Sequence, residues 1–478
     1  MHEAIKGLEP HALWSYFSDL CVIPRESGNE EGVRQYLLSF AKEHNLEAIV
    51  EEIGNVIIKK PAAKGFEQRP SVALQGHMDM VCVKTPESTH NFETDPIELV
   101  RDGDWLQAKD TSLGADNGIA VAIILDILSD PNAKHGPLEA IFTVAEETGL
   151  NGAFGLEKEH ITSRLLINLD SEEEGIFYIG CAGGVETDVE LTAKWESTPA
   201  HHQGFELVVD GLKGGHSGAE IHTQRANSIK IAARLLTQLD EYRIFKAEGG
   251  SKRNVIPSTA TIGFTIPKDQ EAHLHELVKT TLTELLGEFE VADPAISLTV
   301  TKGETPSESI DASRLFDALY SAPHGVDAMS LSLEGIVETS TNLAILSLDK
   351  EKFTVTASHR SSILSARDDV ARRFATIFDL AGAKTSHSGG YPSWKPNVDS
   401  PLAAFAARAW KEYANEEPVI TAIHAGLECG IINSKVPGMD SVSFGPDMSD
   451  VHSTKEKVSI PSTKRISDFT RHLLEIIE

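Results

Sequence analysis

Three segments decide the fold: SVALQGHMD (residues 71–79), EAIFTVAEE (139–147) and RLLINLDSEEE (164–174). Each is a short apolar run that ends abruptly in polar or charged residues. Such runs are typical of strands buried on both faces of a parallel sheet. Between the first two lies GADNGIAVAIILDILSD (114–130), in which a glycine-containing turn leads into a helix. The sequence therefore predicts an α/β fold: a mostly parallel central sheet flanked by helices, with the polar residues in the crevice at the carboxyl ends of its strands.

The neighbouring segments extend this pattern. Ser27 and Glu30 have the spacing of a capping box, which predicts that Ser27 begins the helix over residues 33–41. Hydrophobic periodicity predicts five further elements: helices near 13–21, 401–414 and 462–477, and strands at 55–60 and 441–445.

After residue 186 the pattern changes to alternating apolar and polar residues, which is typical of half-exposed antiparallel strands. Segments of this kind lie at 204–218, 258–266, 295–303 and 351–363, and helical stretches at 227–239, 271–289 and 368–382. A chain of 478 residues is long enough for two domains. We therefore predict a catalytic domain formed by residues 1–186 and 391–478, and an inserted α+β domain formed by residues 187–390.

Composition and charge exclude several classes of function. Asp and Glu number 72 against 43 Lys and Arg, and this excess of negative charge would repel nucleic acid. The four cysteines are scattered, without the spacing of a disulfide scaffold, a zinc ribbon or a redox motif. No signal peptide and no apolar stretch of membrane-spanning length are predicted. These observations predict a cytoplasmic protein that binds neither nucleic acid nor membranes.

One set of polar residues stands at the ends of the predicted strands and loops. Its members are His77, Asp79, Asp116, Glu146, Glu147, Asp170 and His452. Carboxylate oxygens and imidazole nitrogens without thiolates suit zinc, manganese or cobalt. A carboxylate can also bridge two cations about 3.5–4 Å apart, which can activate water and polarise a carbonyl group. The set therefore predicts a hydrolase site with two metal ions.

Each member also has a structural explanation when it is taken alone. The pair Glu146–Glu147 resembles a solvated helix start, Asp170 a cap or turn residue, and His452 a loop residue. The joint occurrence of all these groups at the ends of strand-like runs favours the ligand set.

Longer motifs carry a family resemblance. In chain order they are GHMDMV (76–81), TSLGADNGIAVA (111–122), EETGLNGAFGL (146–156), NLDSEEEG (168–175), CAGG (181–184), GLKGGHSGAEIH (211–222), RNVIPSTA (253–260), VETSTN (337–342) and HAGLECG (424–430). Together they resemble the co-catalytic zinc peptidase superfamily of dipeptidases, aminoacylases and glutamate carboxypeptidases. Within it, the chain resembles the family of cytosolic non-specific dipeptidases, also called aminoacyl-histidine dipeptidases. The likeness extends from end to end and is loosest in GPDMSDVHSTKE (445–456).

The resemblance implies a ligand set for two divalent metal ions. Asp116 would bridge them, His77 and Asp170 would hold one ion, and Glu147 and His452 the other. Zinc is the expected metal, and cobalt or manganese accept the same ligands.

The resemblance also implies roles in catalysis. Glu146 would be the general base, and Asp79 would orient the imidazole of His77. The peptide bond between Asp116 and Asn117 would be cis.

The inserted domain resembles the lid of this family. His216 would stabilise an oxyanion, Asn254 and Arg360 would bind the C-terminal carboxylate of the substrate, and His424 or Glu428 would line the substrate pocket. In smaller relatives a lid histidine acts across a dimer interface, whereas a doubled lid could supply it within one chain. The oligomeric state therefore stays open between a homodimer and a monomer.

The predicted function is hydrolysis of unblocked dipeptides with broad specificity, Xaa-His dipeptides included. Two alternatives stay open. One is a related aminoacylase, deacylase or aminotripeptidase, and the other is a metal-free binding scaffold on the same fold.

Overall fold

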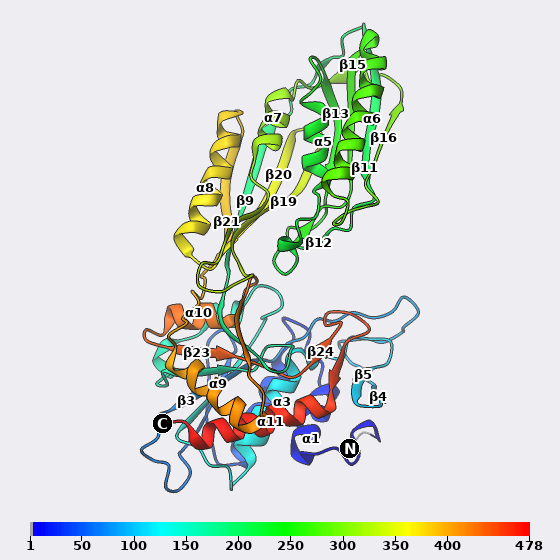
Figure 1. The fold of residues 1–478 in the computed structure, drawn as a ribbon. Coiled ribbons are helices and arrows are strands. Elements are labelled where there is room, and N and C mark those ends of the chain that lie inside the picture. The colour runs from blue at the N-terminus through cyan, green and yellow to red at the C-terminus, as the bar shows by residue number, and fades with distance from the viewer. Residues whose placement is uncertain (1–2) are drawn as a thin grey trace. The chain divides into compact units, whose positions relative to one another are not determined.

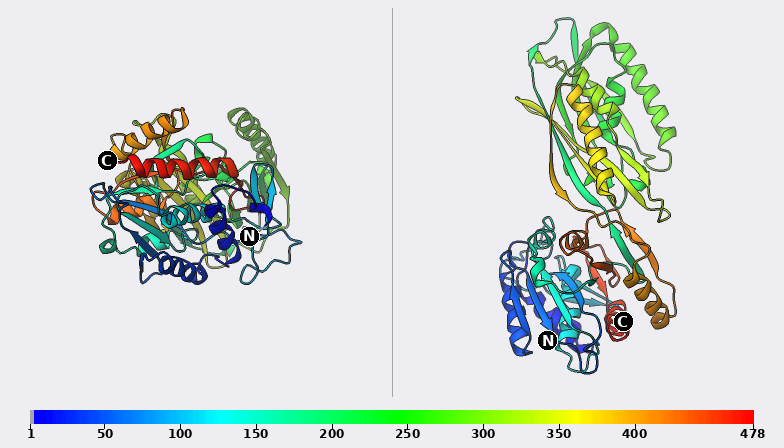
Figure 2. Two further views of the ribbon diagram at one scale, coloured as in Figure 1. Left: turned by 90° about the horizontal axis from the view of Figure 1, so that it is seen from below. Right: turned by 90° about the vertical axis from the view of Figure 1, so that its left-hand side faces the viewer.

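An eight-stranded sheet is the framework of the first of two units into which the chain divides. The structure is a computed structural model that describes residues 3–478. Unit 1 runs to Cys181 and also contains Trp394–Ala422 and Leu427–Glu478, whereas unit 2 contains Ala182–Ser393 and Ile423–Gly426. Both chain ends belong to unit 1 (Figure 2).

The sheet of unit 1 has the order β1-β2-β6-β3-β7-β23-β8-β22. Its strands are β1 (Glu47–Val50), β2 (Val56–Lys60), β3 (Val72–His77), β6 (Leu138–Thr143), β7 (Leu165–Asn168), β8 (Ile176–Cys181), β22 (Val419–Ile423) and β23 (Asp440–Ser443). The four central strands β6, β3, β7 and β23 are parallel, while β2 and β8 join them antiparallel. The three apolar runs that predicted the fold are the neighbours β6, β3 and β7, so the prediction of a parallel central sheet is confirmed.

Helices cover this sheet, and one of them packs closely against the end of a central strand. They are α1 (His11–Val22), α2 (Glu31–Glu43), α3 (Ala115–Ser129), α4 (Asn151–Gly155), α9 (Pro401–Ala414), α10 (Glu428–Lys435) and α11 (Ile460–Ile476). Helix α3 packs against β3 at Gly76, where a Cβ atom would lie 2.5 Å from Oδ1 of Asn117 and 3.0 Å from Cβ of Ala120. Gly76 therefore allows the start of α3 to approach the end of β3.

The predicted capping box at Ser27 is wrong. Helix α2 begins at Glu31 with Glu30 as its N-cap, and no side chain caps it. The Ser27 hydroxyl donates instead to Oδ2 of Asp79 at 2.7 Å, and Glu30 Oε1 accepts from the backbone N–H groups of Gly28 and Ala145. Each of the two side chains thus forms a hydrogen bond with a residue that is distant in sequence, and neither caps α2.

A small four-stranded sheet of unit 1, in the order β24-β25-β5-β4, carries the loop of His452. Its strands are β4 (Leu99–Asp102), β5 (Trp105–Ala108), β24 (Met448–Ser449) and β25 (Lys457–Ser459).

Unit 2 is an antiparallel sheet with one layer of helices, as the alternating sequence pattern predicts. The strand order is β16-β11-β15-β13-β19-β20-β9-β21, with β18 paired to β19. Its strands are β9 (Gly183–Thr192), β11 (His202–Asp210), β13 (Arg243–Gly249), β15 (Ala260–Pro267), β16 (Ser297–Lys302), β18 (Gly325–Met329), β19 (Val337–Leu348), β20 (Lys352–Ser361) and β21 (Lys384–Tyr391). The helices α8 (Leu364–Leu380), α7 (Ser313–Ser321), α5 (Ser228–Leu236) and α6 (Glu271–Glu288) lie side by side in that order (Figures 1 and 2).

No helix within residues 3–478 combines the length and the apolar character that crossing a membrane requires.

Candidate metal centre

The carboxyl ends of the parallel strands in unit 1 bring all five predicted metal ligands together. His77 is the last residue of β3, Glu147 follows β6, and Asp170 follows β7. Asp116 is the second residue of α3, and His452 lies in the loop between β24 and β25. Strand ends, a helix start and a loop that are distant in sequence thus converge at one place.

Asp116 lies between two histidines. Its Oδ1 is 3.0 Å from Nε2 of His77, and its Oδ2 is 3.1 Å from Nε2 of His452. Nε2 of His77 is also 3.4 Å from Oδ1 of Asp170, and Nε2 of His452 is 3.0 Å from Oε2 of Glu147. Two groups of potential ligands result, and the carboxylate of Asp116 belongs to both.

The donor atoms and their spacing fit two cations. Ligands of a tetrahedral ion lie roughly 3.3 Å apart when each bond is about 2.0–2.2 Å long. The distances of 3.0 to 3.4 Å within the two groups are close to this value. All donors are imidazole nitrogens or carboxylate oxygens, so the site suits zinc, cobalt or manganese.

The charge of the site also fits cations. Burial, followed by the negative charges of Asp116 and Glu428, raises the pKa of Asp170 to about 7. Hydrogen bonding to Asp116 and Glu147 raises the pKa of His452 to about 11, so that this imidazole must release a proton before its nitrogen binds an ion. Buried carboxylates of this kind are normally paired or coordinate metals.

Glu146 lies beside the ligands without belonging to either of these two groups. Its carboxylate is within 4.8 Å of ligand atoms of His77 and Glu147. Burial raises the pKa of Glu146 well above its ordinary value, and the negative charges of Asp170 and Glu147 act in the same direction. A carboxylate with a raised pKa can accept a proton near neutral pH and later release it.

Asp79 connects the ligand histidine to both glutamates. Its Oδ1 lies 3.3 Å from Nδ1 of His77 and accepts from the N–H of Glu146 at 3.1 Å. Its Oδ2 accepts from the N–H of Glu147 and from the hydroxyl of Ser27. Burial opposes the charged form, but these donors outweigh burial and lower the pKa of Asp79 to about 2. An ionised Asp79 therefore lies beside the ring of His77 and accepts hydrogen bonds from the backbone of the turn that carries Glu146 and Glu147.

Replacing Asp79 with Asn should lower metal affinity, activity or both by about 10- to 100-fold, because His77 loses the partner that fixes its ring. Two measurements check this prediction: the metal content of the variant after dialysis against a weak chelator, and its kcat/KM for a dipeptide. Asp293→Asn is the matched control, since Asp293 is also fully buried and also accepts two backbone N–H groups, those of Lys213 and Ala226. Equal losses in both variants would contradict a specific role for Asp79.

Two supporting residues escaped sequence reasoning. Asn117 accepts from the N–H of His77 at 3.2 Å and donates to the carbonyl of Leu169 at 3.0 Å, while its peptide bond to Asp116 is cis, as the resemblance implied. Arg25 is buried and donates to the carbonyls of Met78 and Asp79. Neither has a sequence signal of its own beyond the motif GADNG around Asn117, because their partners are distant in sequence.

Glu428 takes part in a buried hydrogen-bond network. It is fully buried, and its Oε2 accepts from Gln75 Nε2 at 2.5 Å and Thr143 Oγ1 at 2.6 Å. Gln75 in turn accepts from Asn168. The side chain of Glu428 is therefore part of a buried network across the strand ends, and its role toward a substrate stays a prediction.

The predicted residues of the inserted domain also gather, within unit 2. His216 in β12 (Gly215–His216) pairs with Val255 in β14 (Val255–Ile256), next to Asn254. Nε2 of His424 lies 2.7 Å from Oγ of Ser340. Besides burial, the positive charges of Arg360 and His216 lower the pKa of His424 to about 3, which indicates that these three side chains share one region of unit 2.

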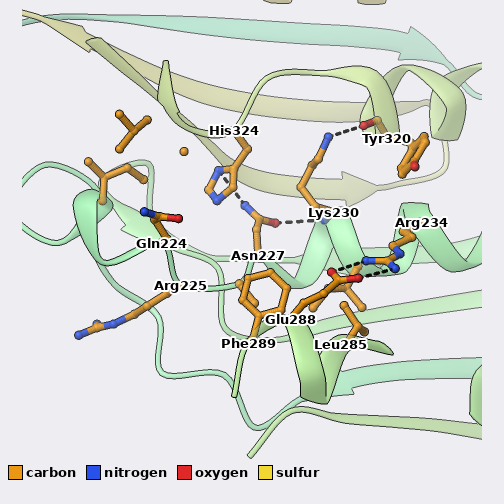
Figure 3. A pocket seen from close by; sticks show the side chains of 15 residues that line it. Gln224, Arg225, Asn227, Lys230, Arg234, Leu285, Glu288, Phe289, Tyr320 and His324 are labelled. Atoms are coloured by element: carbon orange, nitrogen blue, oxygen red, sulfur yellow. Dashed lines mark hydrogen bonds and ion pairs between the residues drawn. The ribbon is translucent and has the colours of Figure 1, made fainter. Parts of the chain in front are cut away.

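Two other polar features of unit 2 include none of the predicted residues. One is a pocket of about 520 Å³ lined by α5 and α6, in which Asn227 contacts His324 and Arg234 pairs with Glu288 (Figure 3). The other is the group His201, His202 and Glu241, in which Nε2 of His202 lies 2.9 Å from Oε1 of Glu241. The charged groups named here already have partners within the protein.

Comparison with known proteins shows which family this chain resembles. Residues 73–476 match the model of peptidase family M20/M25/M40. The chain is 38% identical to the cytosol non-specific dipeptidase of Escherichia coli K12, over 99% of each chain.

Solved structures give the same result for the fold. An aminoacylhistidine dipeptidase from Vibrio alginolyticus matches with a TM-score of 0.92 and 39% identity, over 100% of this chain and 99% of that one. An aminopeptidase from Bacillus cereus matches with a TM-score of 0.58 and 17% identity over 98% of each chain, and this likeness concerns the fold alone.

Proposed function

Because the chain belongs to peptidase family M20/M25/M40, we propose that it hydrolyses unblocked dipeptides with broad side-chain tolerance, Xaa-His dipeptides included. The observation that carries this proposal is the position of Asp116, one carboxylate between two histidine-containing ligand groups with Glu146 beside them. The names of the E. coli and Vibrio relatives support dipeptides as the substrates.

The proposed cofactors are two divalent metal ions, with zinc as the expected metal. His77, Asp116 and Asp170 would hold one ion, and Asp116, Glu147 and His452 the other. Bound there, such ions polarise the scissile carbonyl and acidify the attacking water.

Glu146 is the proposed general base. Its carboxylate would take a proton from the attacking water and hand it to the nitrogen of the departing amine. The carboxylate of Glu146 lies within 4.8 Å of ligand atoms of His77 and Glu147, and a carboxylate can take up a proton and release it again. Asp79 contacts both His77 and the backbone of Glu146, so it would fix the position of the general base relative to this metal ligand.

His216, Asn254, Arg360 and His424 are proposed to bind the substrate. Arginine suits a carboxylate because its guanidinium forms two parallel hydrogen bonds. Alanine variants at Arg360 and Asn254 would show this role as a rise in KM for dipeptides with metal content unchanged.

A substrate panel tests the proposed specificity. Chelator-treated protein that has been reloaded with zinc should cleave free dipeptides, and kcat/KM should be far lower for tripeptides and for N-acetyl amino acids. The reason is that an exopeptidase site recognises both charged ends of a dipeptide, and charged groups left without partners are costly to bury. Preference for N-acetyl amino acids would favour a deacylase, and preference for tripeptides an aminotripeptidase.

Metal analysis tests the remaining alternative. A binding scaffold should hold well under one ion per chain and should cleave none of these substrates. Small peptides are the proposed partners, and a cytosolic location follows the name of the E. coli relative.

A further inference from the structure

The loop that supplies His452 ends in a buried glutamate. Glu456 is only 3% exposed and belongs to neither ligand group. Its Oε2 accepts from the N–H groups of Leu113 at 2.7 Å and Gly114 at 2.9 Å, and its Oε1 from those of Ala115 at 2.7 Å and Asp116 at 3.3 Å. One side chain thus binds four consecutive backbone donors that end at the shared aspartate.

These donors lie in the segment that leads into α3, in which Asp116 still has non-helical backbone angles. The first N–H groups of a helix have no partner within the helix, and the N-cap residue of α3, Gly114, has no side chain to supply one. Gly114 is also in the left-handed region, with φ 70°. The carboxylate of Glu456 takes the place of a local cap, and its negative charge is favoured at a helix N-terminus.

The loop from Asp450 to Glu456 is held in an uncommon conformation. Asp450 and His452 have φ values of 55° and 58°, in the left-handed region that few residues other than glycine adopt. Such conformations persist where surrounding contacts hold them. The Ser453 hydroxyl donates to the carbonyl of Asp450 at 2.6 Å and accepts from the N–H of Lys455 at 3.1 Å. Glu456 anchors the end of this turn.

A closed loop of contacts results. The side chain of Asp116 lies 3.1 Å from the ring of His452, the chain leads from His452 to Glu456, and Glu456 returns to the backbone N–H of Asp116. We propose that Glu456 is a positioning residue that sets the distance between Asp116 and His452, and so the affinity of one of the two ion sites. This inference rests on the two-ion site of the proposed function.

Glu456→Gln tests the proposal, because it keeps the shape of the side chain but removes its charge and one of its acceptor oxygens. Chelator-treated protein is titrated with Co²⁺, followed by its visible absorption, and metal content is measured after dialysis. We expect one ion to be held about 10- to 100-fold more weakly and the other nearly unchanged. For a dipeptide, kcat should fall while KM stays the same, because Glu456 is buried and is not one of the residues proposed to bind the substrate.

Glu139→Gln is the matched control. Glu139 is also 3% exposed, and its carboxylate accepts from the N–H groups of Thr162 and Ser163 and from the Thr162 hydroxyl, remote from the ligands. This variant should lose stability but keep both ions. If Glu456→Gln binds both ions as tightly as the wild type, or if Glu139→Gln weakens one ion equally, the inference is overturned.

A second variant covers the case in which Glu456→Gln does not fold. Glu456→Asp keeps the charge but shortens the side chain by one methylene group. This variant should fold and should bind the same ion more weakly. Unchanged binding of both ions would overturn the inference. The wild-type titration separates this proposal from the proposed function. If the wild-type protein binds fewer than two ions or does not hydrolyse dipeptides, both the proposed function and the role of Glu456 are refuted. If the wild-type protein is active with two ions and Glu456→Gln binds them equally well, only the role of Glu456 is refuted.

Discussion

Replacing Glu146 with Gln should lower kcat by about 10²- to 10⁴-fold, the range expected for loss of a general base. Gln keeps the size of the side chain, and its amide cannot accept the proton of the attacking water. Both ligand groups remain complete in this variant, because neither the Asp116 group with His77 nor that with His452 includes Glu146. Metal content should therefore stay at the wild-type level while turnover is lost.

The measurement is a dipeptide assay together with metal analysis of the same sample. Glu147→Gln is the matched comparison, since Glu147 is the next residue and its Oε2 lies 3.0 Å from Nε2 of His452. That variant should lose an ion as well as activity. Full activity in Glu146→Gln would refute the proton-transfer role, and loss of metal there would reassign Glu146 as a ligand.

Replacing Asp116 with Asn should weaken both ions at once. The two oxygens of Asp116 face different histidines, and an asparagine offers one oxygen and no charge. We expect reloaded Asp116→Asn to hold well under one ion per chain, against about two for the wild type, and to have no measurable dipeptidase activity. His452→Ala should keep about one ion, because His77, Asp116 and Asp170 remain.

Asp126→Asn provides the control for this experiment. Asp126 lies in the same helix α3 and is 4% exposed, but its carboxylate pairs with Arg471 rather than with a ligand. Its replacement should cost stability and leave the metal content unchanged. A wild-type metal content in Asp116→Asn would show that Asp116 does not bridge the ions.

Local hydrophobic patterning predicted the framework well. The runs that became β3, β6 and β7 are mostly apolar and almost entirely buried because both faces of the central sheet are covered, and this signal needs no knowledge of the rest of the chain. The polar residues after these strands could be placed together for the same reason, since parallel strands end at one edge.

Contacts between distant residues could not be predicted in this way. Ser27 has the local pattern of a helix cap, yet its hydroxyl binds Asp79, so a tertiary hydrogen bond replaced the local one. Arg25 and Glu456 belong to residue types that are usually exposed, and nothing near them in sequence reveals that their partners are backbone groups of Met78 and Leu113–Asp116. The residues that support the candidate site were therefore harder to find than those that form it.

The division of the chain has a consequence for protein engineering. Ile423–Gly426 belongs to unit 2, although the chain on both sides of it belongs to unit 1. A fragment cut at residues 182 and 393 would therefore lack His424, and the hydroxyl of Ser340 would lose its imidazole partner. Recombinant expression of this portion by itself would require the tetrapeptide to be grafted back through a designed linker or a circular permutation.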